Sequence, residues 1–237
     1  TANQTLHHLV NTIPIDRLVL KTPNFDADTK YGVVFLVIGA HYETEQRIEI
    51  RKQWVSESKM QLSGKSLVIF VVGRSSALEE EANDNRDLLQ IDVEESYRNM
   101  VYKIEGSYRW IKHNIDSEYV AKVDSDTVVH IDRLYGHLRR KGRAQNEHLL
   151  ACYSGPHAAP MRDMCSPWYI SESDYRLHFL PAYCNGPAYI MKRNTFNVIV
   201  ERMKTHKVIE VEDAFFTGIV AGEFTDVVVS NMFAARY

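Results

Sequence analysis

Two uninterrupted apolar runs, separated by a segment of helix-forming residues, constrain the fold of this chain more than any other feature. The first run, residues 31–39, has no polar alternation and is flanked by turn-prone residues, which is typical of a buried strand. Residues 43–60 are good helix formers, with Ile50 and Trp54 four apart on one face, and the second apolar run follows at 66–72. Together they predict a strand–helix–strand unit.

The rest of the chain continues this alternation. Between Tyr97 and Ile111 apolar residues recur at three-and-four spacing, which indicates a helix with one face against a sheet. We predict further strands at 119–123, 149–153 and 187–191, and further helices at 132–140, from 194 to about 204 and from about 212. Strands that alternate with helices predict an α/β fold, with a mostly parallel sheet and helices on both faces.

Composition and domain organisation exclude several classes of protein. The chain has 237 residues, of which 45% are apolar and 25% charged, and it contains no linker-like stretch. These values favour one globular domain over residues 1–237 and exclude disordered, collagen-like and coiled-coil chains. The formal net charge of −3 provides no basic field for nucleic acid, so we expect no nucleic-acid partner.

Residues 154–185 form an irregular excursion from the predicted sheet, and such excursions often build binding sites. Two of the three cysteines, Cys165 and Cys184, lie in it, and Cys152 lies just before it. They form no CxxC pair, which argues against a zinc ribbon and allows one disulfide with one free thiol.

Two carboxylates, Asp124 and Asp126, follow the predicted strand 119–123. Because they are two apart in extended chain, both project to the same side, and ligands of open α/β sheets bind at such strand ends. Carboxylate oxygens suit Mg²⁺ or Mn²⁺, with a substrate diphosphate supplying further ligands. About one Asp-x-Asp is expected by chance in such a chain, and we assign Asp26-Ala27-Asp28 to that chance. Turn formation and helix capping are the alternative role for Asp124 and Asp126.

Two further charged pairs have both a structural and a functional interpretation. Glu212 and Asp213 precede an apolar run where a helix would begin, so they either complement the helix dipole or provide a carboxylate base near a metal-bound leaving group. Arg47 and Arg51 lie four apart on the first helix, where they either grip phosphate or form a solvated face. The sequence lacks HExxH, GxSxG, Walker and GxGxxG motifs, so it gives no support to the common hydrolase, nucleotide-triphosphate and dehydrogenase classes.

An ordered series of short blocks resembles the β-1,3-galactosyltransferase and Fringe-related glycosyltransferases, glycosyltransferase family 31. The blocks are Arg47-Ile48-Glu49-Ile50-Arg51-Lys52-Gln53-Trp54, Phe70-Val71-Val72-Gly73, Asp87 to Asp92, Tyr97-Arg98-Asn99-Met100-Val101-Tyr102-Lys103, Lys122-Val123-Asp124-Ser125-Asp126, Trp168-Tyr169-Ile170-Ser171, Pro181-Ala182-Tyr183-Cys184-Asn185-Gly186 and Glu212-Asp213-Ala214. The resemblance implies a GT-A fold with a nucleotide-sugar half at about 31–130 and an acceptor and catalytic half at about 150–237. It also implies a Golgi-lumen enzyme, held in the membrane by an N-terminal anchor that this chain lacks.

The resemblance also assigns roles to particular residues. Asp126 would bind Mn²⁺, with Mg²⁺ as the alternative, and Asp124 would contact the metal or the ribose. Arg47, Arg51 and Ser125 would hold the nucleotide-sugar, and Asp213 would be the catalytic base. Trp168, Tyr183, Gly186 and Glu212 would contact the acceptor or donor sugar, although packing alone is as good an account of the two aromatic residues.

The implied activity is an inverting, metal-dependent transfer of a hexose from a UDP-sugar to a glycan, glycolipid or glycoprotein hydroxyl, which forms a β-1,3 linkage. Galactose is the first choice of sugar and N-acetylglucosamine the second. Two departures from the family pattern are Ser125, in place of the middle Asp, and the lack of any His after His206, where the family supplies a metal ligand. The second departure leaves open a truncated C-terminus, a metal shell completed by phosphate and water, or a degenerate member that binds without turnover. A Mg²⁺-dependent phosphohydrolase is a further alternative, but it leaves the other blocks unexplained.

Overall fold

The two apolar runs form adjacent parallel strands, β2 (Tyr31–Ile38) and β3 (Ser66–Val72), at the centre of a large sheet. The computed structural model of the chain describes residues 2–61, 65–141, 148–154, 157–224, 227–229 and 234–236. In these residues the main sheet has eight strands in the order β1-β4-β3-β2-β5-β8-β7-β9. The remaining strands of this sheet are β1 (Val19–Lys21), β4 (Leu88–Ile91), β5 (Ser117–Asp124), β7 (Leu150–Ser154), β8 (Cys184–Lys192) and β9 (Val227–Val229).

The middle of the sheet is parallel and its second half is mixed. Strands β4, β3, β2 and β5 run in one direction, whereas β8 is antiparallel to both β5 and β7. Strand β7 in turn pairs with β9 in parallel, and β1 pairs with β4 in antiparallel. A separate ladder joins β6 (Thr127–Val129) to β10 (Ala234–Arg236). The predicted α/β class, with a mostly parallel sheet and helices on both faces, is confirmed.

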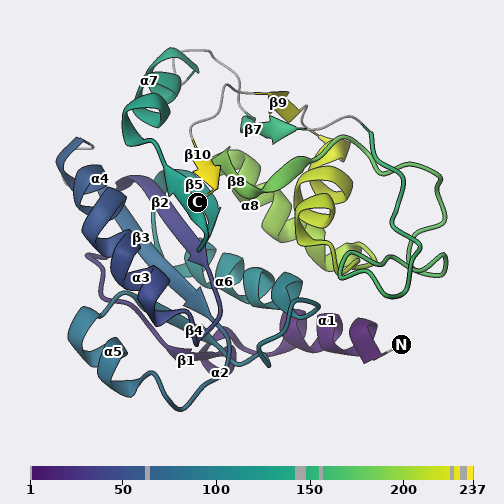
Figure 1. The fold of residues 1–237 in the computed structure, drawn as a ribbon, viewed down its shortest axis with the longest axis horizontal. Helices are drawn as coiled ribbons and strands as arrows, with labels where there is room; N and C mark the ends of the chain where they lie inside the picture. Colours follow the sequence, from purple (N-terminus) through teal and green to yellow (C-terminus); the bar gives the residue numbers. More distant parts are fainter. Residues whose placement is uncertain are drawn as a thin grey trace.

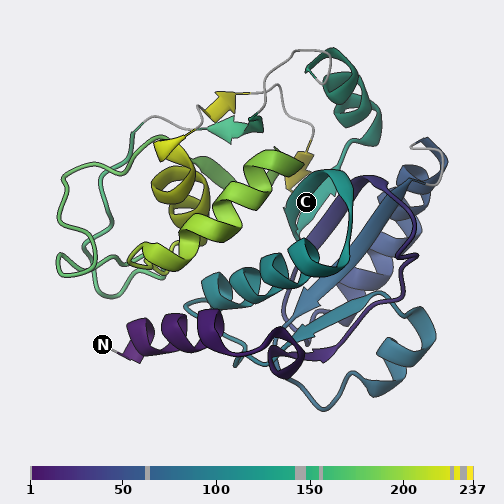
Figure 2. The same ribbon diagram turned by 180° about the vertical axis from the view of Figure 1, so that it is seen from behind.

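Helices cover both faces of the sheet, as the front and back views show (Figures 1 and 2). One face carries α3 (Thr44–Ile50), η1 (Arg51–Val55), α4 (Ser56–Gln61) and α7 (Ile131–Lys141), whereas α6 (Met100–Asn114) and α8 (Arg193–Arg202) cover the other. The other helical segments are α1 (Ala2–Thr12), α2 (Ile15–Leu18), α5 (Glu79–Asn85), η2 (Met203–Thr205), η3 (Ala214–Val220) and η4 (Ala221–Glu223). None of the helices in the described residues has the length and apolarity needed to cross a membrane.

Alternation along β2 builds a hydrophobic core on each face of the sheet. Val34, Leu36 and Ile38 join the core under α6 and α8, and Val33 and Phe35 join the core under α3 and α7. Because successive side chains of a strand point to opposite faces, a strand covered on both sides must be apolar throughout. This requirement explains the unbroken run that the sequence shows.

Several elements differ from the predicted ones. The helix expected over 43–60 is interrupted at Gln53 (φ −87°, ψ −105°), beyond which Trp54 packs edge-on against Phe35 with ring centroids 5.4 Å apart. Strand β4 was not predicted, since four residues are too few to show a periodicity. A disulfide joins Cys152 of β7 to Cys184 of β8, and Cys165 is a free, exposed cysteine, so one pair and one free thiol are observed.

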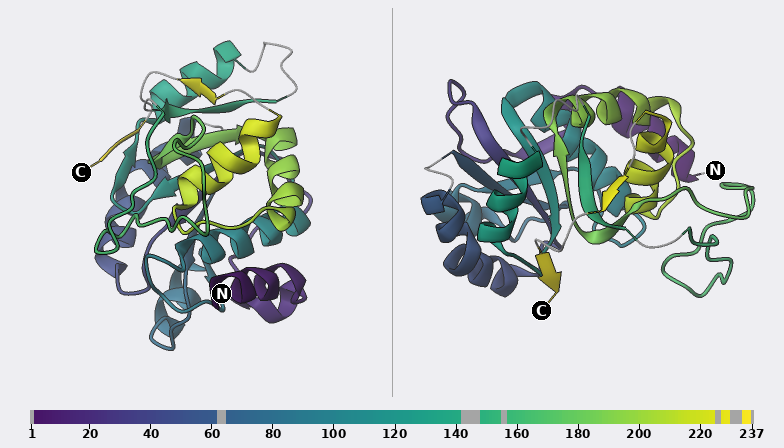
Figure 3. Two further views of the ribbon diagram at one scale, coloured as in Figure 1. Left: turned by 90° about the vertical axis from the view of Figure 1, so that its right-hand side faces the viewer. Right: turned by 90° about the horizontal axis from the view of Figure 1, so that it is seen from above.

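The sheet topology brings distant parts of the sequence to one edge. Parallel strands β2, β3 and β5 end at the same edge, and antiparallel β8 begins there, because Val123 pairs with Ala188 and Tyr119 with Lys192. The excursion before β8 projects from the body of the protein beside this half of the sheet, which is clear when the molecule is seen from the side and from above (Figure 3). A functional site is therefore expected at the carboxyl edge of the parallel strands.

Candidate active site

A buried lysine at the end of β5 organises this edge of the sheet. Lys122 is fully buried, and its Nζ donates to Asp124 Oδ1 at 2.5 Å, to Glu212 Oε1 at 2.6 Å and to the carbonyl oxygen of Gly186 at 2.7 Å. An ammonium has three donors, and these three acceptors use all of them. Lys122 thus connects β5, the start of β8 and the segment before η3.

The charges of this cluster shift one another's protonation. Burial alone would lower the pKa of Lys122, but Asp124 and Glu212 outweigh it, so the pKa is raised and the lysine stays charged. Burial raises the pKa of Glu212 to about 7, in spite of Lys122, and the neighbouring Asp213 and Asp124 charges add to the increase. Burial also raises the pKa of Asp213. The cluster therefore contains carboxyl groups that take up protons more readily than exposed ones do.

Asp213 faces Asp124 across Gly186. Its Oδ1 accepts a hydrogen bond from the backbone N–H of Ala214 at 2.7 Å, which caps the start of η3, as the structural interpretation of Glu212-Asp213 predicted. A Cβ atom placed on Gly186 would lie 3.4 Å from Asp213 Oδ2 and 3.7 Å from Asp124 Oδ2. Asp213 thus accepts the backbone N–H groups of Ala214 and Gly186, and its Oδ2 lies beside the gap that the missing side chain of Gly186 leaves.

A chain of buried hydroxyl groups supports Glu212 from behind. The hydroxyl of Tyr189 donates to Glu212 Oε2 at 3.3 Å, and it lies 2.7 Å from the hydroxyl of Tyr108. Both tyrosines are fully buried. Because a buried carboxylate without partners is costly, these contacts fix the orientation of Glu212 and, through the chain, of Asp213 beside it.

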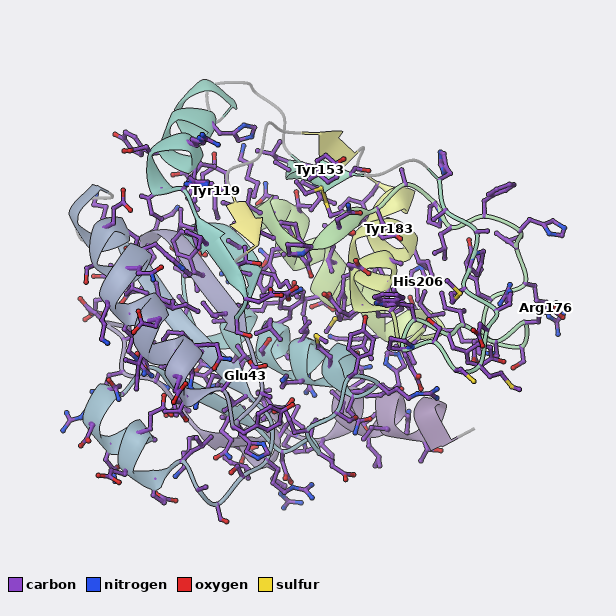
Figure 4. The ribbon with its side chains drawn as sticks, in the orientation of Figure 1. Glu43, Tyr119, Tyr153, Arg176, Tyr183 and His206 are labelled. Atoms are coloured by element: carbon purple, nitrogen blue, oxygen red, sulfur yellow. A yellow bond between two sulfur atoms is a disulfide. The ribbon has the colours of Figure 1, made fainter. Side chains whose placement is uncertain are left out.

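A cavity of about 340 Å³ opens in front of the cluster, and the predicted triplet Asp124-Ser125-Asp126 forms part of its lining. Asp126 is exposed, whereas Asp124 is partly buried. The cavity is also lined by Glu43, which Figure 4 labels, and by Glu95, Tyr97 and Lys103. Among the described lining residues, four carboxylates and a single ammonium therefore face this space.

Ser125 has a structural partner inside the cavity. Its hydroxyl donates to Glu43 Oε2 at 2.7 Å, and the same oxygen accepts the backbone N–H of Ala40 at 2.9 Å. An aspartate at position 125 would bring two carboxylates together here, so serine suits Glu43 as its neighbour. The structure joins the end of β2 to the end of β5 through this pair.

A second buried pair holds the floor of the cavity. Lys103 Nζ donates to Glu95 Oε1 at 2.5 Å and to the carbonyl oxygen of Gly39 at 2.8 Å, while Glu95 Oε2 accepts the N–H of Gly73 at 2.8 Å. Burial lowers the pKa of Lys103, and Glu95 opposes that effect. The ends of β2, β3 and α6 are thereby tied together.

The structure places Arg47 and Arg51 in protein ion pairs. Arg47 is 1% exposed and donates to Glu81 and to the carbonyl oxygens of Ala40 and His41, at 2.8 Å and 3.0 Å respectively. Arg51 donates to both carboxylate oxygens of Asp87 and to Glu81. Neither arginine lines the cavity of Asp124. Their predicted contact with the nucleotide stays a prediction; the observed contacts fix the loop after β2.

The two predicted aromatic contacts lie on the excursion side of the site. Trp168 is 54% exposed and forms a hydrogen bond with Tyr97. Burial, together with the charges of Asp213 and Glu212, raises the pKa of Tyr97 to about 12. Burial and Asp213 also raise the pKa of Tyr183, whose position Figure 4 shows. Both predicted aromatic residues thus lie near the carboxylate cluster, Trp168 through Tyr97.

The donor set fits a hard divalent cation. In the described residues no group of three or more His, Cys, Asp or Glu side chains is arranged to hold a metal ion. Asp124 and Asp126 offer carboxylate oxygens to the cavity, and Mg²⁺ or Mn²⁺ commonly takes one or two carboxylates, with phosphate and water as the other ligands. The residues present are therefore compatible with the expected metal.

Sequence reasoning missed several residues of this site. Glu43 and Glu95 are carboxylates that follow strands β2 and β4 by a few residues, which is a signal that could have been used. Lys103 and Lys122 belonged to the blocks that were noticed, but nothing in their spacing indicates that they are buried. Tyr189 could not have been found, because its role depends on the antiparallel pairing of β8 with β5.

Comparison with known proteins assigns the chain to a family. A family model described as galactosyltransferase matches residues 45–232, and the chain belongs to this family. The chain is 28% identical over 205 residues to beta-1,3-galactosyltransferase 5 of Mus musculus, and the alignment covers 83% of this chain and 65% of that protein. It is 27% identical over 221 residues to beta-1,3-galactosyltransferase bre-2 of Caenorhabditis elegans, and that alignment covers 86% of this chain and 60% of that protein. The chain thus spans less than two thirds of each of these relatives.

Among solved structures, 4-diphosphocytidyl-2C-methyl-D-erythritol synthase is 10% identical, with a TM-score of 0.49, and the match covers 89% of this chain and 94% of that one. A glycosyltransferase involved in the glycosylation of the major capsid of PBCV-1 is 11% identical, with a TM-score of 0.37, covering 73% and 65%.

We expect the relative stability of a Glu212→Gln variant to change between pH 4.5 and pH 7. The carboxyl has a pKa of 4.5 when exposed and about 7 in the folded protein, so in this window the folded parent holds a proton that the unfolded chain has lost. The free energy of unfolding of the parent therefore falls as pH rises through the window, and the variant lacks that contribution. Urea unfolding should show the variant gaining about 3 kcal/mol on the parent between these pH values.

An exposed control, Glu45→Gln, should show no such trend. A difference between Glu212→Gln and the parent that stays constant from pH 4.5 to pH 7 would contradict the raised pKa of Glu212.

Proposed function

We propose that this chain catalyses transfer of a hexose, galactose before N-acetylglucosamine, from a UDP-sugar to a hydroxyl group of a glycan, forming a β-1,3 linkage. Family membership and the names of the relatives support the hexosyl transfer. The observation that carries the proposal is the arrangement of Asp213 and Asp124, whose Oδ2 atoms face the same gap beside Gly186. Asp213 can accept the proton of the attacking hydroxyl there, while Asp124 lies toward the leaving group.

Asp213 is the proposed base of a single inverting displacement. Its Oδ2 takes the proton of the acceptor hydroxyl as that oxygen forms a bond to the anomeric carbon. The bond from the anomeric carbon to the diphosphate oxygen breaks in the same step, and UDP leaves with the electron pair. A carboxylate whose pKa is raised toward the working pH is a stronger base than an exposed one.

A diphosphate would need a bound cation to enter this cavity of carboxylates. In the part of the lining that the structure describes, Glu43, Glu95, Asp124 and Asp126 face Lys103 as the one counter-charge, so a bare diphosphate would meet net repulsion there. Asp126 and Asp124 would hold the Mn²⁺ or Mg²⁺ ion, which supplies positive charge to the leaving diphosphate when bound. Lys122 holds Asp124 in place from behind.

The arginines are assigned a positioning role. Arg47 fixes the carbonyl groups of Ala40 and His41, and Ala40 lines the cavity, so Arg47 shapes the wall against which the nucleotide-sugar lies. Arg51 shares Glu81 with Arg47 and so supports the same loop. Ser125 contributes through its hydrogen bond to Glu43.

The acceptor would approach from the side of the excursion, residues 154–185. Trp168 and Tyr183 offer aromatic faces near Asp213, which suits the apolar face of a sugar ring. The acceptor is a glycan, free or carried by a glycolipid or glycoprotein. The proposed location is the Golgi lumen, with membrane attachment through an N-terminal anchor.

A family member that binds the UDP-sugar or glycan without turnover is the second candidate. Such a chain would bind UDP in the presence of Mn²⁺ and transfer nothing.

We expect the Asp213→Asn variant to lower kcat of hexosyl transfer by about 100-fold or more, because it removes the proton acceptor. The Asp126→Ala variant should lose Mn²⁺-dependent transfer, because it lacks a ligand of the ion. Release of UDP from UDP-galactose and UDP-N-acetylglucosamine, measured over a panel of β-linked acceptors with Mn²⁺ or EDTA, checks both. Asp28→Ala, an exposed residue of the other Asp-x-Asp, is the control and should keep parental activity.

Transfer by the parent that survives Asp213→Asn unchanged would contradict the assigned base. UDP binding without transfer by the parent would support the second candidate, and failure to bind UDP with Mn²⁺ would contradict both.

We expect a Gly186→Ala variant to fold normally and to lose most of its transfer activity. The added methyl group would make ordinary contacts of 3.4 Å and 3.7 Å with Asp213 and Asp124, so stability should change by less than about 1 kcal/mol, while the gap between the carboxylates is filled. Steady-state kinetics together with urea unfolding measures both effects. Parental kcat in a folded Gly186→Ala variant would place the chemistry elsewhere.

A further inference from the structure

A second cavity lies beside the N-terminal helix α1, and its lining carries basic and neutral polar side chains where the first cavity carries carboxylates. It has a volume of about 510 Å³ and lies between α1 and the segment that includes η2. Its lining residues are all His, Lys, Asn or Thr, and no Asp or Glu is among the described residues that line it. They include His7, His8, Asn11, Lys204, His206 and Lys207.

The inner wall of this cavity is held in place by a buried carboxylate. Glu105 of α6 is fully buried, with His7 Nδ1 at 3.1 Å from its Oε2 and Asn11 Nδ2 donating to its Oε1 at 2.5 Å. Arg109 also donates to the carbonyl oxygens of Val10 and Ile13. These contacts fix α1 on α6, so the cavity is part of the folded structure.

The outer wall is formed by the segment after α8. The ring Nδ1 of His206, a residue labelled in Figure 4, lies 2.8 Å from the carbonyl oxygen of Arg202. A carbonyl oxygen only accepts, so Nδ1 carries the proton and Nε2 is the second polar atom of the ring. The hydroxyl of Thr205 donates to the same carbonyl oxygen at 2.9 Å, which keeps this wall in one conformation.

Positive charge is in excess around the cavity. Lys204 Nζ lies 3.1 Å from Glu201, and Lys207 Nζ lies 3.2 Å from Asp174. Glu201 is shared with Lys112, so Lys112, Lys204 and Lys207 share two carboxylates, while Arg109 offsets the charge of the third carboxylate, Glu105. The side chains of Lys204 and Lys207 are 40% and 46% exposed, and such surface pairs are weak enough to rearrange around an incoming anion.

We propose that this cavity is an anion-binding site that takes a sulfate, phosphate or carboxylate group carried by a sugar. Lys204 and Lys207 supply the charge, and the exposed His8 of α1 adds a polar ring to the lining, whereas His7 and Asn11 are held by Glu105. A single inorganic anion would fill a small part of about 510 Å³, so the cavity has room for the sugar ring as well. The site shares no lining residue with the cavity of Asp124.

Binding of inorganic sulfate, inorganic phosphate, galactose 6-sulfate, glucuronate and neutral galactose to the full chain tests this proposal by calorimetry. We expect the anions to bind and galactose not to bind. The double variant Lys204→Gln/Lys207→Gln should weaken anion binding at least about 10-fold. The control Lys52→Gln/Lys30→Gln changes the net charge equally at exposed lysines elsewhere, and Lys52 forms the same kind of exposed pair with Glu49 as Lys204 does with Glu201.

Tighter binding of the sugar sulfate than of sulfate would support an anion carried by a sugar, whereas equal binding would overturn the sugar part of the proposal and assign the site to the free anion. No anion binding by the parent, or equal losses in both double variants, would overturn the proposal. Because no donor sugar or metal is present, the result does not depend on the proposed transfer activity. Unchanged UDP binding with Mn²⁺ in the Lys204→Gln/Lys207→Gln variant would confirm that the two cavities are independent.

Discussion

The position of one buried ammonium group determines the rest of the candidate active site. Lys122 has no solvent contact, so its charge must be met by the protein, and its three acceptors come from β5, β8 and the segment before η3. Satisfying this one lysine brings Asp124, Gly186 and Glu212 together. Asp213 follows Glu212 directly in the sequence, so the same lysine places the proposed base opposite Asp124.

Two glycines and two carboxylates repeat this pattern at the neighbouring strand ends. A Cβ on Gly73 would lie 2.8 Å from both Glu95 Oε2 and the backbone oxygen of Val93, so glycine is required there, and a Cβ on Gly39 would lie 2.8 Å from Glu43 Oε2 and displace that carboxylate. The carboxylates in turn accept backbone N–H groups that follow β2 and β3. The fold thus collects negative charge at one edge of the sheet, while the cavity beside α1 collects positive charge. The ligands proposed for the two cavities differ accordingly: a metal-bound diphosphate in one and an anionic sugar in the other.

The sequence predicted the sheet well and the site only in part. Unbroken apolar runs, such as residues 31–38 and 66–72, directly indicate buried strands. Asp124 and Asp126 could be placed at a strand end because strand direction follows from the alternation with helices. Spacing could not show that Arg47 and Arg51 turn toward Glu81 and Asp87, since a helical face looks the same in sequence whether its partner is a ligand or a protein carboxylate. Nor could it show that Asp213 both caps η3 and faces Gly186. Those features depend on pairings between residues 27 to 36 positions apart in the sequence.

A double-mutant cycle on Lys122 and Glu212 tests most directly whether the lysine holds the site together. Urea unfolding of the parent, Lys122→Met, Glu212→Gln and the double variant is measured at pH 8, where Glu212 is ionised. Lys122→Met should cost about 3–5 kcal/mol, because it leaves buried carboxylates without a cation. The double variant should cost less than the sum of the single variants by about 1–3 kcal/mol. Costs that add to within about 0.5 kcal/mol would show that the two residues do not depend on each other and would contradict this account of the site.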